Sequence, residues 1–293
     1  MKETTELAYG KINLSLDVIG RRADGYHLVR MIMQTVGIAD TIEIREMDKE
    51  EISVETDSGH IPDGPDNLVW KAADIMRREY GLKSGLSIHL TKRIPIAAGM
   101  AGGSADAAAV MRALRRMYVL DAPDHRLEEL ALPIGTDVPY CIAGGTQLSE
   151  GIGEVLTVLP HAPQCSLVVV KPDLYVSTGW VYKAFDGIPG EEIQHPDVDA
   201  MAACIDRGDL RGMASLCGNV LEQKTGQEYP VIGELERFLS ESGAVRALMT
   251  GSGPTVFGIF EDKEKAQRAL DGLNDRYPDF QRFLTEFVWP EEL

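Results

Sequence analysis

The stretch "GMAGGSADAAA", from Gly99 to Ala109, places three glycines within five residues and then runs at once into Ser104, Asp106 and alanines. Glycine loses the most backbone freedom on folding, whereas alanine is the most favourable residue inside a helix. The join therefore predicts a loop that leads into a helix N-terminus. Ser104 is the expected N-cap, and we expect the helix to reach about Tyr118.

A glycine loop before a helix has two interpretations. The first backbone N–H groups of a helix lack partners within the helix and carry partial positive charge, so they bind anions such as phosphate. Alternatively, the small residues only allow a tight, closely packed turn. The stretch matches neither the P-loop pattern G-x-x-x-x-G-K-[ST] nor the dinucleotide pattern G-x-G-x-x-G, so other segments must decide.

Length and charge narrow the class of protein. The chain has 293 residues, 44% of them hydrophobic, which suits one large domain or two moderate ones. Its formal charge of −17 disfavours a nucleic-acid binder, whose affinity comes from neutralising phosphates, and an anionic membrane surface as partner. A local basic pocket for a small phosphate compound stays compatible with this charge.

The cysteines and the N-terminal segment indicate the cellular compartment in which the protein resides. Cys141, Cys165, Cys204 and Cys217 form no C-x-x-C pair, which predicts free thiols in a reducing cytoplasm. The start "MKETTELAYGKINLSL" has no apolar signal core, and no apolar run approaches the length of a membrane span. We therefore expect a soluble cytoplasmic protein.

Periodic patterns divide the N-terminal half into elements. Alternation of apolar and polar residues predicts strands at 7–19, 41–46, 51–56 and 86–95. Helical periodicity predicts helices at 66–81, capped by Asp66 or Asn67, and at 125–132. Residues 20–27, "GRRADGYH", are expected to form a charged loop.

The glycine-rich segment "IGTDVPYCIAGGTQLSEGIGE" (134–154) contains Asp137 directly before Val138 and Pro139. A proline disfavours the helical region for the residue before it, so we expect Val138 to be non-helical. Asp137 is then expected on an irregular segment, from which its side chain can point into a cleft.

The C-terminal half has its own order of elements. "LPHAPQC" (159–165), with two prolines, is the expected linker. Beyond it we predict a strand, helices, two strands joined by "GSGP", a helix and a final strand, at 165–171, 177–242, 244–250, 255–260, 263–273 and 281–289 respectively. The order β-α-β-β-α-β, with additional helices in the first crossover, is typical of a ferredoxin-like domain.

With these elements in order, the chain resembles the GHMP small-molecule kinases. The resemblance lies in "PIAAGMAGGSADAAA" and in the turn "TGSGPTVF" (250–257). Four further segments are similar to the branch of that family that phosphorylates the 2-hydroxyl of CDP-methylerythritol in non-mevalonate isoprenoid biosynthesis: "AYGKINLSLDVIGRRADGYHLVRMIMQTV", "GTDVPYC", "GGTQLSEGIGE" and "NVLEQKT". The likeness spans nearly the whole chain. One departure is Met100-Ala101, where the family often has Leu-Gly, because Ala101 resists a positive φ.

The resemblance implies an α+β fold of two domains. Residues 1–160 would form a ribosomal-protein-like α/β domain that carries the ATP phosphate loop, and residues 164–293 the ferredoxin-like domain. It also implies ATP and Mg²⁺ as cofactors, with no metal ligands identified. The expected partner is the small-molecule acceptor alone, without nucleic acid or membrane, and the expected state is a monomer or a homodimer.

The resemblance also assigns candidate site residues. Asp137 would be the general base, and Lys11 would orient and stabilise the charges around it. Contacts to ATP would come from Pro95, Ala97, Ala98, Gly99, Met100, Ala101, Gly102, Gly103, Ser104 and Ala105, with Asn67 and Lys92 at the adenine end. Contacts to the acceptor would come from Asn13, Tyr26, His27, Tyr175 and Thr178, with Tyr26 as the flat face for cytosine and Tyr175 as a second wall.

Several of these residues also have a purely structural interpretation. Asp137 alone suits a turn cap, and Lys11 a solvated lysine at a strand end. Tyr175 equally suits an aromatic residue that fills a domain interface, and Asn67 a helix cap. Asp106 would repel a nearby phosphate, so it either faces away from the nucleotide or approaches magnesium.

Three other functions compete. Another GHMP kinase, such as a homoserine or mevalonate kinase, is disfavoured by "GRRADGYH", because those acceptors need no cytidine pocket. A catalytically silent nucleotide sensor is disfavoured by the presence of both Lys11 and Asp137. An RNA-binding module, which the shared N-terminal architecture suggests, is disfavoured by the charge of −17.

Overall fold

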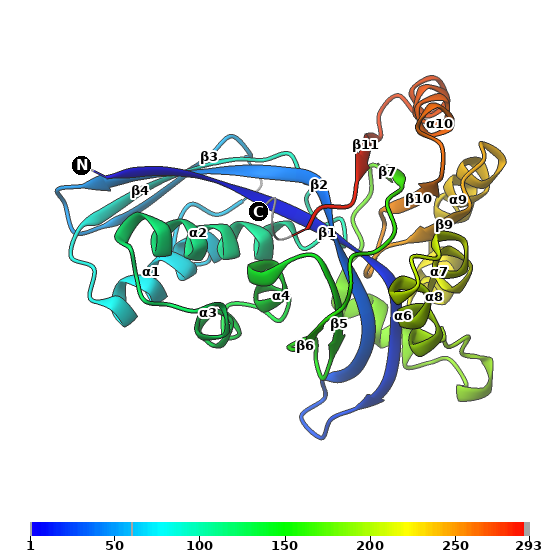
Figure 1. Cartoon of the computed structure of the whole chain (residues 1–293), viewed down its shortest axis with the longest axis horizontal. Helices are drawn as coiled ribbons and strands as arrows, with labels where there is room; N and C mark the ends of the chain where they lie inside the picture. The colour runs from blue at the N-terminus through cyan, green and yellow to red at the C-terminus, as the bar shows by residue number, and fades with distance from the viewer. Residues whose placement is uncertain (1, 60, 290–293) are drawn as a thin grey trace.

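The computed structural model describes residues 2–59 and 61–289. Within these residues the chain forms a seven-stranded sheet from its N-terminal half and a four-stranded sheet from its C-terminal half. Figure 1 shows the two sheets side by side, with α1 and α2 against the larger sheet and α9 and α10 beside the smaller one. This arrangement confirms the expected α+β fold.

Two long antiparallel strands, β1 (Glu3–Arg21) and β2 (His27–Met47), form the centre of the larger sheet. Both exceed the predicted strands, and β2 includes residues 28–40, for which no strand was predicted. Residues 31–36 are all buried, so this part of the strand has lost the apolar–polar alternation that a half-exposed strand shows. The loop between the strands is shortened to residues 22–26.

The remaining strands of this sheet flank that pair. The strand order is β3-β4-β2-β1-β8, and β5 pairs with β2 and β6. Their bounds are Ile52–Thr56 for β3, Gly85–Thr91 for β4, Thr146–Glu150 for β5, Val155–Val158 for β6 and Gly218–Asn219 for β8. Strand β4 ends before the predicted residue 95, because Asp57 and Asp40 accept the next backbone N–H groups, those of Lys92, Arg93 and Ile94.

Helices α1 (Leu68–Tyr80), α2 (Gly102–Tyr118) and α4 (Val138–Ala143) pack on the larger sheet, and α3 (Asp124–Ala131) packs against α4. The Asn67 side chain caps α1 by accepting a hydrogen bond from Val69 N at 2.8 Å, as one of the two predicted caps. The alanines of α2 are buried, and their small side chains let this helix lie close to both α1 and β1.

The predicted N-cap of α2 is wrong. The helix begins at Gly102, Ala101 stands at the N-cap position, and Ser104 lies inside the first turn. The reason is that Ala105 N already bonds Ala101 O at 2.8 Å. Ala101 adopts a φ of 55°, contrary to the expectation that its methyl group resists this conformation. An alanine there costs about 1–2 kcal/mol and persists only where surrounding contacts determine the backbone.

The expectation for Val138 is also wrong. Val138 is the first residue of α4, with Asp137 at the N-cap position and Pro139 in the first turn. The first turn of a helix tolerates proline because its missing N–H would have no helical partner anyway. Asp137 therefore lies at the start of a helix instead of on an irregular segment.

The smaller sheet has the order β11-β7-β10-β9, with antiparallel neighbours throughout. Its strands are β7 (Ser166–Lys171), β9 (Arg246–Met249), β10 (Val256–Phe260) and β11 (Gln281–Glu286), and its principal helices are α9 (Val231–Glu241) and α10 (Lys263–Arg276). This order confirms the ferredoxin-like prediction. The additional helices are α5 (Thr178–Phe185), a 3₁₀ turn (Gly190–Glu192), α6 (Val198–Asp206), α7 (Leu210–Leu216) and α8 (Glu222–Glu228).

Strands and side chains cross between the two halves. The short strand β8 pairs in parallel with Ser15 and Leu16 of β1, and Phe287 bridges to Val36 of β2. Phe287 is buried in the same hydrophobic core as the long strands. The division of the chain into domains of residues 1–160 and 164–293 stays a prediction. Among the described residues, no helix has the length and apolarity that crossing a membrane requires.

Candidate active site

Two glycine segments meet at the junction of the sheets: the glycine loop (residues 95–103) and the glycine turn (residues 250–254). Gly99 has a φ of 70°, and a Cβ atom there would lie 2.4 Å from the Thr250 carbonyl oxygen. Gly251 has a φ of 59°, and a Cβ atom there would lie 2.7 Å from the Gly99 carbonyl oxygen. Because real Cβ atoms do not approach that closely, both positions require glycine for packing.

The first cavity, of about 540 Å³, opens beside these segments. Gly102 and Gly103 line it at the start of α2, so these two glycines leave the helix N-terminus open to a ligand. Most of the predicted site residues line this cavity, namely Lys11, Asn13, Asn67, Lys92, Pro95, Ala97, Ala98, Gly99, Ala101, Gly102, Gly103, Ser104, Asp137, Tyr175 and Thr178.

Four predicted residues lie elsewhere. The side chains of Met100 and Ala105 are buried in the core and do not belong to the lining. The Met100 carbonyl instead accepts a hydrogen bond from Lys11 N at 3.1 Å, which ties the glycine loop to β1. Tyr26 and His27 line the second cavity, described below.

Lys11 and Asp137 come together in the first cavity. Lys11 lies within β1 and is 5% exposed, so its interpretation as a solvated lysine is wrong. Its ammonium donates to Asn13 Oδ1 at 2.7 Å and to the Gly99 carbonyl at 3.2 Å, and lies 3.9 Å from Asp137 Oδ2. The Asp137 side chain makes no capping hydrogen bond to the described residues of α4, so its carboxylate stays available beside the ammonium.

Asn13 and Thr250 hold this lysine in place. Asn13 is fully buried; its backbone N–H donates to Thr250 Oγ1 at 2.9 Å, and its side-chain oxygen accepts from Lys11. Thr250 belongs to the glycine turn, so β1 of one sheet and a turn of the other together fix the position of the ammonium. Thr250 was not predicted as a site residue, although it begins the quoted turn "TGSGPTVF".

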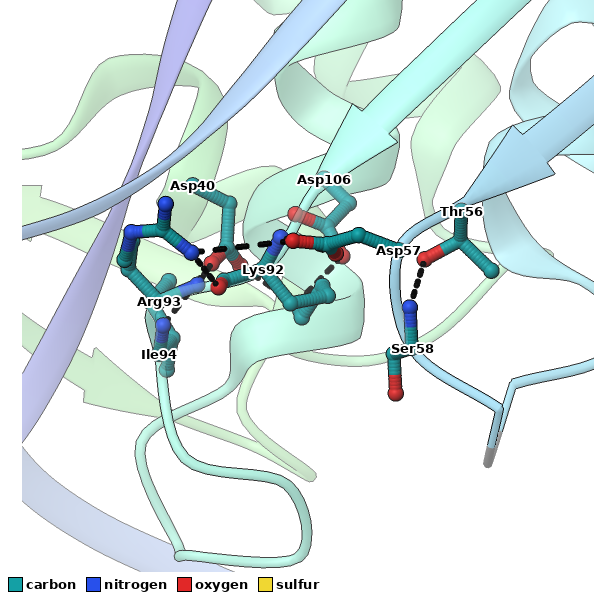
Figure 2. A network of polar contacts seen from close by, with 8 residues as sticks. All are labelled: Asp40, Thr56, Asp57, Ser58, Lys92, Arg93, Ile94 and Asp106. Atoms are coloured by element: carbon teal, nitrogen blue, oxygen red, sulfur yellow. Dashed lines mark hydrogen bonds and ion pairs between the residues drawn. The ribbon is translucent and has the colours of Figure 1, made fainter.

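Lys92 lies between two buried carboxylates, as Figure 2 shows. Its ammonium donates to Asp106 Oδ2 at 2.7 Å and also to Asp40. Asp106 is 2% exposed, and its other oxygen has no hydrogen-bond partner among the described residues. Burial, partly offset by the Lys92 charge and reinforced by Asp40, raises the pKa of Asp106 to about 8.

The Asp40–Lys92–Asp106 cluster explains how a carboxyl group at Asp106 can lie near a phosphate site. Its carboxyl is held by Lys92, and the raised pKa favours the neutral acid near pH 7. A neutral carboxyl does not repel an anion at the nearby helix N-terminus. Asp40 was not predicted, although a charged residue within the otherwise apolar run "VGIAD" is a signal that could have identified it.

The second cavity, of about 770 Å³, adjoins the first. Its walls are the loop between β1 and β2 on one side and α5 on the other, and both cavities are lined by Val29, Thr136, Ile152, Thr178 and Tyr182. Tyr26 is 58% exposed at its rim. Thr136 belongs to this shared wall and Asp137, the next residue, lines the first cavity, so the two cavities adjoin beside Asp137.

The structure separates Tyr175 from the second cavity. Tyr175 lines only the first cavity and is 71% exposed. Tyr182, which was not predicted, lines both cavities and packs its ring 4.8 Å from that of His27. Tyr182 follows Thr178 by four residues on α5, so the two share one helix face, a signal that the sequence already contained.

Comparisons with known proteins agree with this geometry. The chain matches the family model of the GHMP kinases N terminal domain over residues 67–145 and that of the GHMP kinases C terminal domain over residues 201–279. A relative from Lachnospira eligens, named 4-diphosphocytidyl-2-C-methyl-D-erythritol kinase, is 45% identical over 97% of this chain and 98% of its own length. A relative from Acetivibrio thermocellus with the same name is 43% identical over 98% of this chain and 100% of its own length.

Solved structures are also similar to this chain. A crystal structure of 4-(cytidine 5'-diphospho)-2C-methyl-D-erythritol kinase matches with a TM-score of 0.81 and 30% identity, over 97% of this chain and 99% of that one. A homoserine kinase from Cytophaga hutchinsonii matches with a TM-score of 0.79 over 99% of this chain and 95% of that one, but at 17% identity. The second likeness is one of fold alone.

Proposed function

Because the chain belongs to the GHMP kinases, and within them to the 4-diphosphocytidyl-2-C-methyl-D-erythritol kinases, we propose that it transfers the γ-phosphoryl group of ATP to the 2-hydroxyl of CDP-methylerythritol in non-mevalonate isoprenoid biosynthesis. The observation that carries the proposal is the meeting of Lys11 and Asp137, 3.9 Å apart, beside the glycine loop. An alcohol acceptor needs a group that takes its proton and a cation that stabilises the charge of the transferred phosphoryl group.

In this proposal Asp137 is the general base. Its carboxylate accepts the proton of the acceptor hydroxyl as the oxygen attacks the γ-phosphorus, and ADP leaves. Lys11 orients the carboxylate and stabilises charge on the phosphoryl oxygens, with its ammonium fixed by Asn13 and Gly99. The backbone N–H groups of Gly102 and Gly103, at the start of α2, bind the phosphates.

The adenine end of ATP is assigned to the part of the first cavity near Asn67 and Lys92. Asn67 Oδ1 caps α1, and its Nδ2 donates to the Pro62 carbonyl at 2.7 Å, so this side chain is held rigidly. Its role as a helix cap therefore coexists with a place in the wall of the nucleotide site. The Asp40–Lys92–Asp106 cluster supports the floor of the same region.

The acceptor is assigned to the second cavity. Tyr26 and Tyr182 line it from its two walls, which suits the two faces of a cytosine ring. Thr178 lines both cavities and exchanges a hydrogen bond with Ser252 of the glycine turn at 2.9 Å. An acceptor with its base in the second cavity thus extends its polyol toward Asp137 in the first.

Magnesium is proposed to arrive with the nucleotide. No cluster of three or more His, Cys, Asp or Glu side chains suited to a metal occurs within the described part of the chain. This fits a cation that keeps several waters and is held by substrate phosphates with one or two carboxylates, and Asp137 lines the same cavity as the proposed phosphate site. When bound, Mg²⁺ would neutralise charge on the phosphate oxygens.

A cytoplasmic location is part of the proposal, since ATP is the donor and all four cysteines are free and buried. A monomer or a homodimer in solution is likewise part of the proposal.

The test is ADP release with CDP-methylerythritol, homoserine and mevalonate as separate acceptors. We expect turnover only with CDP-methylerythritol, and ³¹P NMR of the product should show a new phosphate monoester. If the protein turned over homoserine or mevalonate but not CDP-methylerythritol, the proposed acceptor would be wrong. ATP binding without turnover on any acceptor would instead point to a silent sensor.

A further inference from the structure

The segment "NVLEQKT" (residues 219–225) lies beside the glycine turn and contributes Leu221 to the first cavity. Its first residue, Asn219, is 7% exposed and lies on β8, where it pairs with Leu16 of β1. Asn219 itself lines neither cavity. Any effect of this side chain on the reaction must therefore pass through the groups that it binds.

The amide group of Asn219 binds the backbone on both sides of Thr250. Its Nδ2 donates to the Met249 carbonyl at 2.9 Å and to the Gly251 carbonyl at 2.8 Å. Its Oδ1 accepts a hydrogen bond from Leu221 N at 3.1 Å. A side-chain amide offers two N–H donors and one acceptor oxygen, so these three bonds engage both ends of the group and fix its orientation.

The same segment supplies a second contact to this backbone. Within the described residues β9 is an edge strand, so the backbone groups on its outer side need partners from outside the sheet. Met249 is fully buried there, and its N–H donates to Glu222 Oε2 at 2.7 Å, while its carbonyl accepts from Asn219. Asn219 and Glu222 together hold the end of β9 from which the glycine turn begins.

The Thr250 hydroxyl connects this backbone to the catalytic lysine. Thr250 is fully buried, and its Oγ1 accepts a hydrogen bond from Asn13 N at 2.9 Å. Asn13 Oδ1 in turn accepts from the Lys11 ammonium at 2.7 Å. Because a β-branched side chain is stiff at χ1, the place of the Thr250 hydroxyl follows that of its backbone. A displacement of the turn at residue 250 is therefore passed through Asn13 to Lys11.

We propose that Asn219 is a positioning residue for phosphoryl transfer, because its amide holds the backbone around Thr250 and so sets the place of the Lys11 ammonium beside Asp137. The inference rests on the proposed function, since it concerns the role of Lys11 in that reaction. Asn219 acts across the two halves of the chain: it is paired with the strand that carries Lys11 and bonded to the turn that fixes it.

Asn219→Asp tests the proposal with little change in shape. The substitution keeps the oxygen that accepts from Leu221 N, but it places a second oxygen opposite the carbonyls of Met249 and Gly251. We expect kcat with ATP and CDP-methylerythritol to fall by about 10- to 100-fold per folded molecule, since misplaced groups that act in the transition state lower kcat. KM for both substrates should stay within about threefold of wild type. A wild-type kcat in the folded variant would overturn the proposal.

Gln223→Glu is the matched control. Gln223 belongs to the same segment and lines neither cavity, and its amide also binds backbone groups. Its Nε2 donates to the Glu192 carbonyl at 2.9 Å, and its Oε1 accepts from Gln194 N at 3.0 Å. The same change from amide to acid should leave kcat near that of wild type. An equal loss of kcat in this variant would mean that any disturbance of the segment slows the reaction, and Asn219 would lose its positioning role.

Thr250→Val separates transmission through the hydroxyl from a general loosening of the fold. This variant should lower kcat with little change in KM, as Asn219→Asp does. Independent effects multiply, whereas effects that pass through Thr250 do not, so the double variant should lose about as much kcat as the more impaired single variant. A loss equal to the product of the two single losses would contradict the proposal. So would a wild-type kcat in Thr250→Val, even if Asn219→Asp did not fold.

The wild-type protein separates failure of this inference from failure of the proposed function. Absence of turnover by wild type with CDP-methylerythritol would overturn the proposed function. Turnover by wild type together with an unchanged kcat in Asn219→Asp would overturn only the role of Asn219.

Discussion

Asp137 occupies the N-cap position of α4, yet its side chain makes no cap within the described residues. It lies instead 3.9 Å from the buried ammonium of Lys11. Asp137→Asn keeps the size of the side chain and removes the proton acceptor, so kcat should fall by ~10²–10⁴-fold. ATP affinity, measured by calorimetry, should stay close to that of wild type. Near wild-type turnover would remove Asp137 from its proposed role.

A second prediction at the scale of residues concerns two half-buried acids, Glu222 on α8 and Glu236 on α9. Burial, followed by the negative charge of Glu222, raises the pKa of Glu236 to about 9. The unfolded chain releases this proton near its ordinary pKa of 4.5, whereas the folded protein keeps it, so the free energy of unfolding falls as pH rises from about 4.5 to about 9.

Glu236→Gln mimics the protonated acid at every pH. Relative to wild type, the variant should gain about 1–3 kcal/mol of unfolding free energy near pH 8.5 and little near pH 5. Urea unfolding at the two pH values measures the difference. Glu234→Gln, at an exposed position of the same helix, is the control and should show no such pH-dependent gain. An equal effect at both pH values would contradict the raised pKa.

At the scale of elements, the glycines of the quoted stretch divide into two roles. Gly99 is required by the contact between the glycine loop and the glycine turn, where an added Cβ atom would lie 2.4 Å from a carbonyl oxygen. Gly103 lines the first cavity, and a Cβ atom there would lie in ordinary contact with Leu68 Cδ1, at 3.4 Å. The phosphate and packing interpretations are thus both favoured, each at its own glycine.

Two substitutions separate these roles. Gly99→Ala should lower the free energy of unfolding by about 2–4 kcal/mol through its positive φ and the close contact. Gly103→Val should leave the melting temperature nearly unchanged but weaken ATP binding, because the branched side chain occupies the proposed phosphate site. Thermal unfolding and calorimetry with ATP distinguish them. Unaltered ATP affinity in a folded Gly103→Val variant would return this glycine to the packing role.

At the scale of the whole molecule, the acceptor site exists only because the two halves of the chain meet. Tyr26 belongs to the loop between β1 and β2, and Tyr182 to α5, yet both line the second cavity. Stacking of a base on an aromatic ring contributes ~1–3 kcal/mol, or roughly 5- to 150-fold in affinity. Tyr26→Ala and Tyr182→Ala should each raise KM for CDP-methylerythritol by about that factor, with KM for ATP unchanged.

Phenylalanine variants supply the control for this prediction. Tyr26→Phe and Tyr182→Phe keep the ring, so their effect on kcat/KM should be mild. Tyr175→Ala tests the original assignment of the second wall, and we expect it to spare acceptor binding because Tyr175 lines only the first cavity. If Tyr175→Ala raises KM for the acceptor and Tyr182→Ala does not, Tyr175 is the second wall for the cytosine.

Local signals in the sequence determined most elements of this protein. The period of α1 and its Asn67 cap, the glycine loop before α2, and the β-α-β-β-α-β order of the C-terminal half all depend on residues close together in the chain. Spacing of apolar residues and capping are short-range effects, so they can be inferred before the tertiary structure is known. The motif resemblance likewise brought Lys11 and Asp137 together as a pair.

Only the tertiary structure decided how these segments meet. Strand β2 is buried through residues 31–36 because other elements cover both of its faces, and this burial erases the alternation that would have revealed the strand. The contact between Gly99 and Thr250, the Asp40–Lys92–Asp106 cluster and the hydrogen bond from Asn219 to Gly251 each join residues that are distant in the chain. Such contacts depend on how the two sheets pack, and no local pattern in the sequence encodes that packing.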